Sequence, residues 1–276
     1  MKIIFFGASR FVLPVIEMLH TNFELALVVT TERDPLDAVP TYCQKNNIPY
    51  ISIKTASEAL PRIQETNAEL GVLAYFGVLL PKEMLGAFPK GILNIHPSRL
   101  PKYRGATPVQ SALLKNENET GVTIITLDEQ MDHGPMLVQE TEMILPADTT
   151  ETLHERLFTK GTKMLQEIIP DYLAGKLPLQ PQNDTEATYT KRSFTKQDGL
   201  IDSTNPPSSE QLDRMIRAYY PWPTVWTRLP INGTEKIVKL LPEGKLQVEG
   251  KNPMSIKDFM NGYPTLQKVI KDIFHE

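Results

Sequence analysis

Residues 1–31 read MKIIFFGASRFVLPVIEMLHTNFELALVVTT, and their pattern indicates the fold class. Residues 3–6 and 25–29 are short apolar runs, which is the pattern of strands that are buried on both faces of a parallel sheet. Between these runs, residues 11–19 place apolar side chains at helical spacing. Strand, helix and strand in this order are typical of an α/β fold.

The same alternation continues through the first half of the chain. Two further apolar runs, 70–74 and 91–95, predict strands, and the segments between the runs contain helix candidates at 40–46, 57–66 and 81–85. We therefore expect a Rossmann-like, doubly wound and mostly parallel sheet. Residues 121–127 and 136–144 are extended runs separated by 128–135, which predicts a hairpin with a long loop.

The second half of the chain changes character. Asp148 and Glu151 have the spacing of a capping box before a helix that Pro170 interrupts and Gly175 ends. A polar, proline-containing stretch then predicts a linker. Beyond it lie a helix candidate and several short extended runs, which predict a smaller β-rich domain. These segments are the linker stretch 177–194, the helix 208–219, the extended runs 225–229, 236–241 and 245–248, and a closing helix at 258–273. We expect domains at 1–176 and 199–276, joined by a linker at 177–198.

Composition excludes several classes of protein. With 41% apolar and 22% charged residues, the 276-residue chain has the composition of a globular protein. No apolar run approaches 18 residues, so we expect no membrane-spanning helix. The net charge of −4 gives no global attraction to nucleic acid. Cys43 is the single cysteine, which excludes an internal disulfide and fits a reducing compartment, so we expect a cytoplasmic protein.

The turn after the first predicted strand argues against a nucleotide cofactor. Gly7 begins this turn, but Ser9 and Val12 occupy the positions where a dinucleotide-binding fingerprint has its second and third glycines. Without these glycines the backbone makes no close approach to a pyrophosphate. We therefore exclude a nicotinamide or flavin nucleotide.

Two polar side chains end the strand at 91–95. Asn94 and His96 are two residues apart, so both point to one face of the strand. An amide beside an imidazole can donate hydrogen bonds to a developing oxyanion. The alternative is a structural pair, with an Asn that caps a turn and a His that bonds the backbone.

Asp132 is the candidate acid or base, because its predicted hairpin loop can fold back over the strand and orient His96. The alternatives are a turn-forming Asp and a metal site of His96, Asp132 and His133, which no metal-binding spacing supports. Ser98 lacks the nucleophile elbow of serine hydrolases. Asn94, His96 and Asp132 together suit a reaction in which the nucleophile belongs to the substrate.

Three segments carry a family resemblance. Residues 94–105 (NIHPSRLPKYRG), 119–123 (ETGVT) and 131–134 (MDHG) resemble the 10-formyltetrahydrofolate-dependent formyltransferases. Residues 187–189 (ATY) and 216–223 (IRAYYPWP) are similar to the methionyl-tRNA formyltransferase branch. The resemblance implies a formyltransferase fold in the catalytic domain and an OB-like C-terminal domain.

The resemblance also implies a reaction. The formyl group moves from 10-formyltetrahydrofolate to the α-amine of methionine on initiator tRNA, with no metal and no covalent enzyme intermediate. Asn94, His96 and Asp132 match the catalytic residues of the family: Asn94 and His96 bond the oxyanion, while Asp132 orients His96 and helps to move a proton. We expect the protein to act as a monomer with the folate and initiator Met-tRNA as its partners.

The family's folate and tRNA contacts map onto further residues. The implied folate contacts are Ser98, Arg99, Leu100 and Pro101, with Phe76, Leu79 and Leu80 in the pterin pocket. The candidate tRNA contacts are Arg33, Arg104, Arg214, Arg217 and Arg228.

Three departures from the family pattern keep alternatives open. The loop at 30–39 is short, Arg99 replaces a leucine, and the cations of residues 199–276 barely outnumber the acids. A sugar-nucleotide N-formyltransferase with the same folate donor therefore stays an alternative. A formyltetrahydrofolate hydrolase and a catalytically inactive RNA-binding protein are weaker ones.

Overall fold

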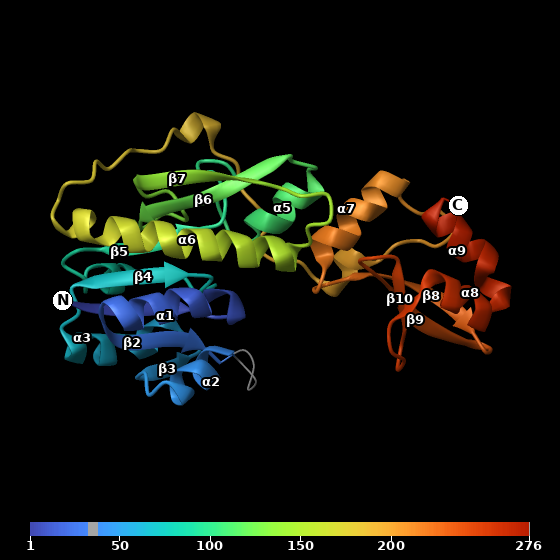
Figure 1. Cartoon of the computed structure of the whole chain (residues 1–276), viewed down its shortest axis with the longest axis horizontal. Helices are drawn as coiled ribbons and strands as arrows, with labels where there is room; N and C mark the ends of the chain where they lie inside the picture. Colours follow the sequence, from blue (N-terminus) through green and yellow to red (C-terminus); the bar gives the residue numbers. More distant parts are fainter. Residues whose placement is uncertain (33–37, 276) are drawn as a thin grey trace. The chain divides into compact units, whose positions relative to one another are not determined.

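The computed structural model describes residues 1–32 and 38–275. The chain forms two compact units, which are described separately (Figure 1). The first unit contains Met1–Pro108, Glu119–Met143 and His154–Thr190, and the second contains Val109–Asn118, Ile144–Leu153 and Lys191–Glu276. None of the helices in the described ranges is long and apolar enough to cross a bilayer.

The first unit is built on a seven-stranded sheet in the order β3-β2-β1-β4-β5-β6-β7. The strands from β3 to β5 in this order are parallel, whereas β5–β6 and β6–β7 are antiparallel, so the predicted mostly parallel sheet is confirmed. Tyr50–Ile53 forms a short edge strand that the sequence pattern did not predict. The strands are β1 Lys2–Gly7, β2 Glu24–Thr31, β3 Tyr50–Ile53, β4 Leu70–Ala74, β5 Ile92–His96, β6 Glu119–Thr126 and β7 Met136–Met143.

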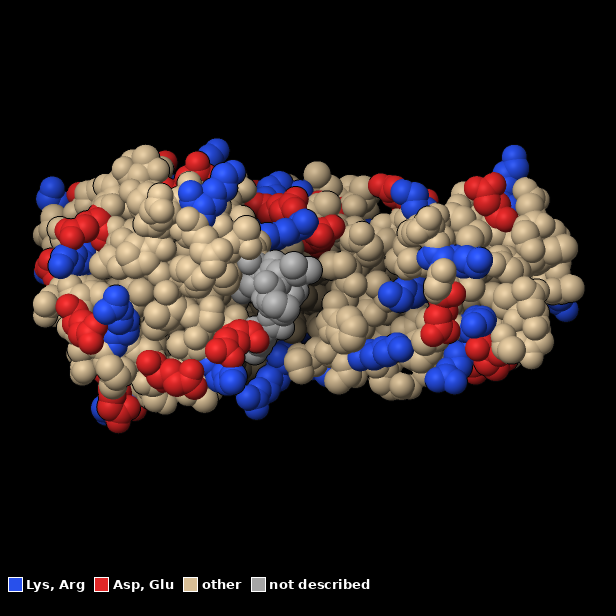
Figure 2. Space-filling view, turned by 90° about the horizontal axis from the view of Figure 1, so that it is seen from below, with Lys and Arg blue, Asp and Glu red and all other residues tan. Residues whose placement is uncertain are grey.

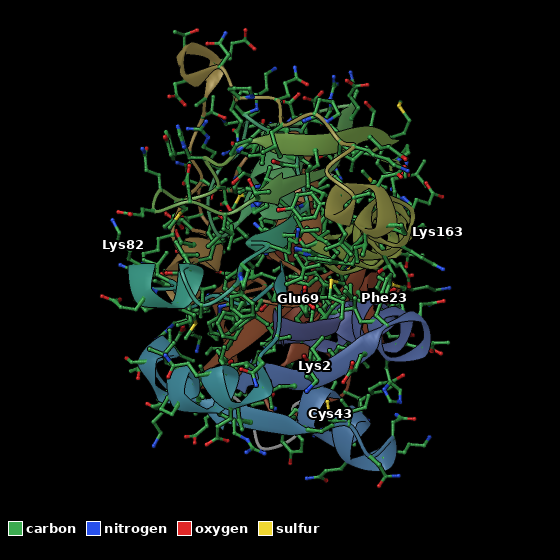
Figure 3. The ribbon with its side chains drawn as sticks, turned by 90° about the vertical axis from the view of Figure 1, so that its left-hand side faces the viewer. Lys2, Phe23, Cys43, Glu69, Lys82 and Lys163 are labelled. Atoms are coloured by element: carbon green, nitrogen blue, oxygen red, sulfur yellow. The ribbon has the colours of Figure 1, made fainter. Side chains whose placement is uncertain are left out.

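Helices cover both faces of this sheet. Figure 3 views it from the amino ends of β1 and β4, with the segment of α6 that carries Lys163 on one side and the α4 residue Lys82 on the other. The helices of this unit are α1 Leu13–Asn22, α2 Ala38–Lys45, α3 Leu60–Thr66, α4 Lys82–Leu85 and most of α6 Thr150–Leu173, whereas α5 Pro108–Leu114 falls almost wholly in the second unit. Helix α5 was not predicted from the sequence.

The two faces of the sheet carry separate sets of buried side chains. On one face Ile4, Phe6 and Ile92 join a core cluster with Ile63 of α3 and Met84 of α4. The opposite face packs against α6. A strand that is buried on both faces reads as a continuous apolar run, which is why the first strand was recognisable in the sequence.

Gly161 brings α6 close to the sheet at β5. A Cβ atom at this position would lie 2.5 Å from Cγ2 of Ile95 and 3.1 Å from Cγ1 of Val122. Ile95 therefore points toward α6. Because side chains alternate along a strand, Asn94 and His96 point to the opposite face of the sheet.

The start of α6 differs from the predicted capping box. Thr149 and Thr152 bond each other reciprocally: each main-chain N–H donates to the other hydroxyl, at 3.0 and 3.3 Å. The Asp148 carboxylate instead accepts from the Leu145 N–H and the Thr152 hydroxyl. The predicted box of Asp148 and Glu151 is therefore wrong, because a nearer hydroxyl pair satisfies the free N–H groups.

Two prolines change the predicted extents of helices. Pro170 lies inside α6, which continues to Leu173, so it does not interrupt the helix. Packing of α6 on the sheet offsets the hydrogen bond that a proline lacks. Pro264 divides the predicted closing helix into α8 Ile256–Gly262 and α9 Gln267–Phe274.

The second unit contains the predicted β-rich region, which is confirmed as a separate antiparallel sheet in the order β11-β10-β9-β8. One face carries the buried side chains of Val225, Val238, Leu240 and Leu246. The elements are α7 Ser209–Tyr219, β8 Val225–Ile231, β9 Thr234–Leu241, β10 Lys245–Val248 and β11 Met254–Ser255, followed by α8 and α9.

The contact between Gly161 and Ile95 makes a testable prediction about stability. We expect Gly161→Val to lower the free energy of unfolding by about 1–3 kcal/mol, because the added methyl groups overpack α6 against β5. Lys163→Val on the exposed face of the same helix is the control, since it adds a β-branched residue without this contact. Urea denaturation of both variants checks the prediction, which equal losses of stability would contradict.

Candidate active site

Asn94 and His96 lie on the face of β5 that is turned away from α6. Asn94 pairs with Leu73 of β4 and with Ile125 of β6, and His96 pairs with Thr123 of β6. Both side chains are about 95% buried. Neighbouring strands thus hold the amide and the imidazole side by side, as the two-residue spacing predicted.

Asp132 approaches this pair from the loop between β6 and β7. The loop begins beside the amino end of β5, where the Leu127 N–H donates to the Ile92 carbonyl, and then folds back over the sheet. Oδ1 of Asp132 accepts from Nδ2 of Asn94 at 3.2 Å and lies 3.6 Å from Nδ1 of His96. Oδ2 accepts from the Gly105 N–H at 2.8 Å. Two segments, β5 and the loop that follows it, therefore contact the carboxylate that a third segment carries.

The partners of His96 define its protonation pattern. Nε2 lies 3.0 Å from the Tyr103 carbonyl oxygen, which can only accept, so Nε2 carries a proton. Nδ1 faces Asp132 and has no proton in the neutral ring. A second proton on His96 would lie between Nδ1 and the carboxylate. The pair can therefore take up one proton and release it, which is the requirement for acid–base catalysis.

Thr123 pins the segment that follows β5. Its hydroxyl donates to the Ser98 carbonyl at 2.7 Å and accepts from the Leu100 N–H at 3.1 Å. The Gln139 amide donates to the same hydroxyl and to the Leu100 carbonyl. The Ser98 hydroxyl donates to the Lys102 carbonyl. The Ser98–Pro101 segment is thus ordered through its backbone.

The residues predicted to contact folate fall into two groups. The Arg99 guanidinium pairs with Glu119, and Leu100 is buried. Phe76 is 3% exposed and packs edge-on against Phe6 in the core, so it offers no surface to a ligand. This corrects the prediction for Phe76: its aromatic ring completes the core.

The other loop positions are more accessible. Leu79 is 70% exposed and Leu80 is partly buried against the core cluster. Pro101 follows Leu100 in a cis peptide bond and is partly buried. Leu79 therefore offers the largest free apolar surface among the predicted folate contacts.

The residues predicted to contact tRNA are not equally accessible. Arg33 lies outside the described residues. Arg104 is 1% exposed and bonds Gln182, Asp184 and Tyr189, which corrects its prediction as a phosphate contact. Arg217 bonds Asp213 and the Asp148 carbonyl.

The two remaining arginines belong to the second unit. Arg214 lies 3.9 Å from Glu210 and keeps 24% of its side chain exposed. Arg228 is exposed on β8 and forms no ion pair with another described residue. Arg228 is therefore the most accessible of the four predicted tRNA contacts that lie among the described residues.

His133 does not join His96 and Asp132. Its Nδ1 lies 2.6 Å from Oδ2 of Asp128, and its Nε2 lies 3.5 Å from Oδ2 of Asp184. Among the described residues, no group of three or more His, Cys, Asp or Glu side chains has the arrangement of a metal site. The proposed set of His96, Asp132 and His133 is thus not formed.

Three site residues were missed at the sequence level: Tyr103, Gly105 and Gln182. Tyr103 and Gly105 act through main-chain atoms, for which side-chain chemistry gives no signal. Gln182 donates to the Asp132 and Gly134 carbonyls from a stretch that was interpreted as a linker. No residue pattern distinguishes it from a solvated glutamine.

An α/β sheet with a polar triad on one face is now defined, and comparison with known proteins identifies its class. Residues 1–169 match the family model described as formyl transferase. A methionyl-tRNA formyltransferase of Methylacidiphilum infernorum is 35% identical over 253 residues, which is 87% of this chain and 78% of that protein. One of Cereibacter sphaeroides is 30% identical over 96% of this chain and 97% of its own. The chain belongs to the methionyl-tRNA formyltransferase family.

Solved structures support the fold over both units. A 4-N formyltransferase from Francisella tularensis matches 88% of this chain and 98% of its own, with a TM-score of 0.70 and 19% identity. A sugar N-formyltransferase from Shewanella covers the same shares, with a TM-score of 0.69 and 18% identity. At these identities the likeness concerns the fold alone.

The surroundings of His133 predict a pH-dependent contribution to stability. The hydrogen bond with Asp128 raises the pKa of His133 above its ordinary 6.5; Asp184 adds to the rise, while partial burial and Arg104 oppose it. Because the folded-state pKa is raised, this stabilisation is complete below about pH 6.5 and is lost as the pH rises through the folded-state pKa.

We therefore expect His133→Gln to destabilise the protein by up to about 1 kcal/mol more at pH 5.5 than at pH 8.5. Chemical denaturation at both pH values measures the difference. His20→Gln at an exposed position of α1 is the control. A gap between wild type and the His133 variant that widens with rising pH would contradict the prediction.

Proposed function

We propose that this protein transfers the formyl group of 10-formyltetrahydrofolate to the α-amine of methionine on initiator tRNA. Membership of the family supports formyl transfer. The observation that carries the proposal is the Asp132 carboxylate, which bonds Asn94 and Gly105 and faces Nδ1 of His96. This arrangement supplies a hydrogen-bond donor and a proton-holding pair, but no protein nucleophile, so the acceptor amine is the nucleophile.

The chemistry follows from these atoms. The neutral amine attacks the formyl carbon, and negative charge develops on the formyl oxygen. Asn94 donates from Nδ2 to this oxygen. Nδ1 of His96 takes the proton that the attacking nitrogen loses, and this proton then lies between the oxyanion and the Asp132 carboxylate, so His96 also stabilises the oxyanion. Asp132 balances the imidazolium charge. The attacking nitrogen loses a proton and N10 of the departing folate gains one, and the His96–Asp132 pair transfers it.

The choice of acceptor rests on the second unit. The outward side of its sheet carries Arg228 on β8 and Lys239 on β9, and the Lys196 ammonium lies 5.2 Å from the centre of the Trp226 ring. Lys239 pairs across the strands with Trp226. Figure 2 shows lysines and arginines gathered over this unit with fewer acidic side chains between them. Trp226 itself is 5% exposed, so the cations alone form the surface, and exposed cations suit a phosphate backbone.

A sugar-nucleotide amine stays as the second candidate acceptor. The sugar N-formyltransferase from Shewanella shares this fold. In addition, two of the predicted tRNA contacts, Arg104 and Arg217, are already bonded within the protein. An extended basic surface is therefore less developed here than the number of arginines suggests.

The catalytic assignment predicts the effect of two substitutions. We expect Asp132→Asn and Asn94→Ala each to lower kcat by about a hundredfold or more, with smaller changes in KM, because both groups act on charge that develops in the transition state. Asp171→Asn, an exposed aspartate on α6, is the control. Steady-state kinetics with thermal melting checks the result, and near-normal turnover in both variants would remove the mechanism.

The acceptor is tested by competition and by salt. Purified protein is given 10-formyltetrahydrofolate with Met-tRNA or with amino-sugar nucleotides, and we expect formylation of the tRNA. The logarithm of kcat/KM should fall linearly with the logarithm of salt concentration. Arg228→Ala and Lys239→Ala should each reduce this slope by about one, whereas Lys163→Ala on α6 should leave it unchanged. A flat salt response with turnover of the sugar nucleotide would favour the second acceptor.

A further inference from the structure

We propose that Gln182 is a positioning residue for formyl transfer: its side-chain amide holds the backbone of the Asp132 loop, and the buried Arg104 holds Gln182. The inference rests on the proposed function, because it concerns the placement of Asp132. It gives the segment before Thr190 a role in catalysis beyond joining two parts of the chain.

The contacts of Gln182 use both ends of its amide. Nε2 donates to the Asp132 and Gly134 carbonyls, each at 2.8 Å. Oε1 accepts from Nε and Nη2 of Arg104 at 3.0 and 2.9 Å. A guanidinium only donates and a carbonyl only accepts, so the amide has a single orientation that satisfies all four bonds. Gln182 is thus a two-sided connector between Arg104 and the loop.

Arg104 is anchored independently of Gln182. Its Nη2 bonds the Asp184 carboxylate at 2.8 Å, and its Nη1 bonds the Tyr189 hydroxyl at 3.2 Å. Its main chain pairs with the same segment, donating to Thr188 and accepting from Thr190, both at 2.8 Å. Because a buried charge is costly unless it is paired, these contacts fix where the guanidinium lies.

Both the carbonyl and the carboxylate of Asp132 are held by groups that connect to Arg104. Gln182 holds the Asp132 carbonyl, while the Asp132 carboxylate accepts from Gly105, the residue that follows Arg104. The backbone of Asp132 itself has a φ of +50°, a left-handed conformation that costs energy for a residue with a side chain. External hydrogen bonds therefore stabilise the conformation that points the carboxylate toward Asn94 and His96.

The neighbouring backbone strengthens this interpretation. The Met136 N–H and the Gln180 carbonyl bond at 2.8 Å, and the reverse pair bonds at 2.9 Å. A Cβ on Gly134 would lie 1.7 Å from the Thr126 carbonyl oxygen, so the loop packs directly on β6. Gln182 adds two hydrogen bonds to the backbone of the same loop. A displacement of about 1 Å at the reacting groups is enough to cost about a hundredfold in rate.

Two variants separate positioning from simple folding. Gln182→Leu removes all four hydrogen bonds at similar volume. Gln182→Glu keeps acceptors for Arg104 but loses both donors to the loop. Asn183→Ala is the matched control, because the Asn183 side chain bonds only Thr185 and Glu186 in the part of the chain that the structure describes.

The experiment combines kinetics with one local probe. We expect both Gln182 variants to lower kcat about 10- to 100-fold and to change KM less than about threefold. The amide proton of Gly105, observed by NMR without substrates, reports its bond to the Asp132 carboxylate and should shift upfield in both variants. Asn183→Ala should match wild type in kcat, KM and the Gly105 signal.

Three outcomes would overturn the inference. They are wild-type kcat in either folded Gln182 variant, an unchanged Gly105 signal, and a loss that appears only as a higher KM. The Asp132→Asn variant distinguishes failure of the inference about Gln182 from failure of the proposed function. If Asp132→Asn is inactive while the Gln182 variants are active, the inference alone fails. If Asp132→Asn is fully active, the proposed function fails whatever Gln182 does.

Discussion

The hydrogen bonds to one carboxylate, that of Asp132, organise the candidate active site. Asp132 is 15% exposed, and a carboxylate so far removed from water needs donors. Asn94 supplies one from β5 and Gly105 supplies another from the loop that follows. Because these donors come from different segments, the carboxylate ties the loop after β6 to the sheet. The position of the carboxylate beside Nδ1 of His96 depends on that tie.

The sheet provides the rigid side of this arrangement. Gly161 lets α6 contact Ile95, and strand alternation then turns Asn94 and His96 to the other face. The Tyr103 carbonyl holds Nε2 of His96, which leaves Nδ1 for Asp132. Because the hydrogen bond to the backbone keeps a proton on Nε2, the neutral ring has no proton on Nδ1. The position of β5 is thus set by the sheet, whereas the position of the loop is set by hydrogen bonds to Asp132 and Gly134.

Local sequence patterns were sufficient to predict elements whose burial or residue spacing determines which residue types occur in them. The first four predicted strands are buried runs, so period and composition revealed them. Asn94 and His96 could be predicted to share one face of the strand, because side chains alternate between the two faces with a period of two residues. The edge strand β3 is short, and only Ile53 in it is buried, so it carries no clear pattern. Arg104 and Phe76 were misassigned because residue type does not report burial, which long-range packing decides.

The sequence alone established an α/β chain with an amide and an imidazole on one face of a strand, because alternation is a property of the local backbone. It also marked Asp132 as a carboxylate that could reach them. Only the tertiary structure showed which nitrogen of His96 faces Asp132, and that Gln182 and Gly105 hold this aspartate. Those contacts join residues 27 to 50 positions apart through backbone atoms. Since every residue has the same backbone groups, no sequence pattern announces them.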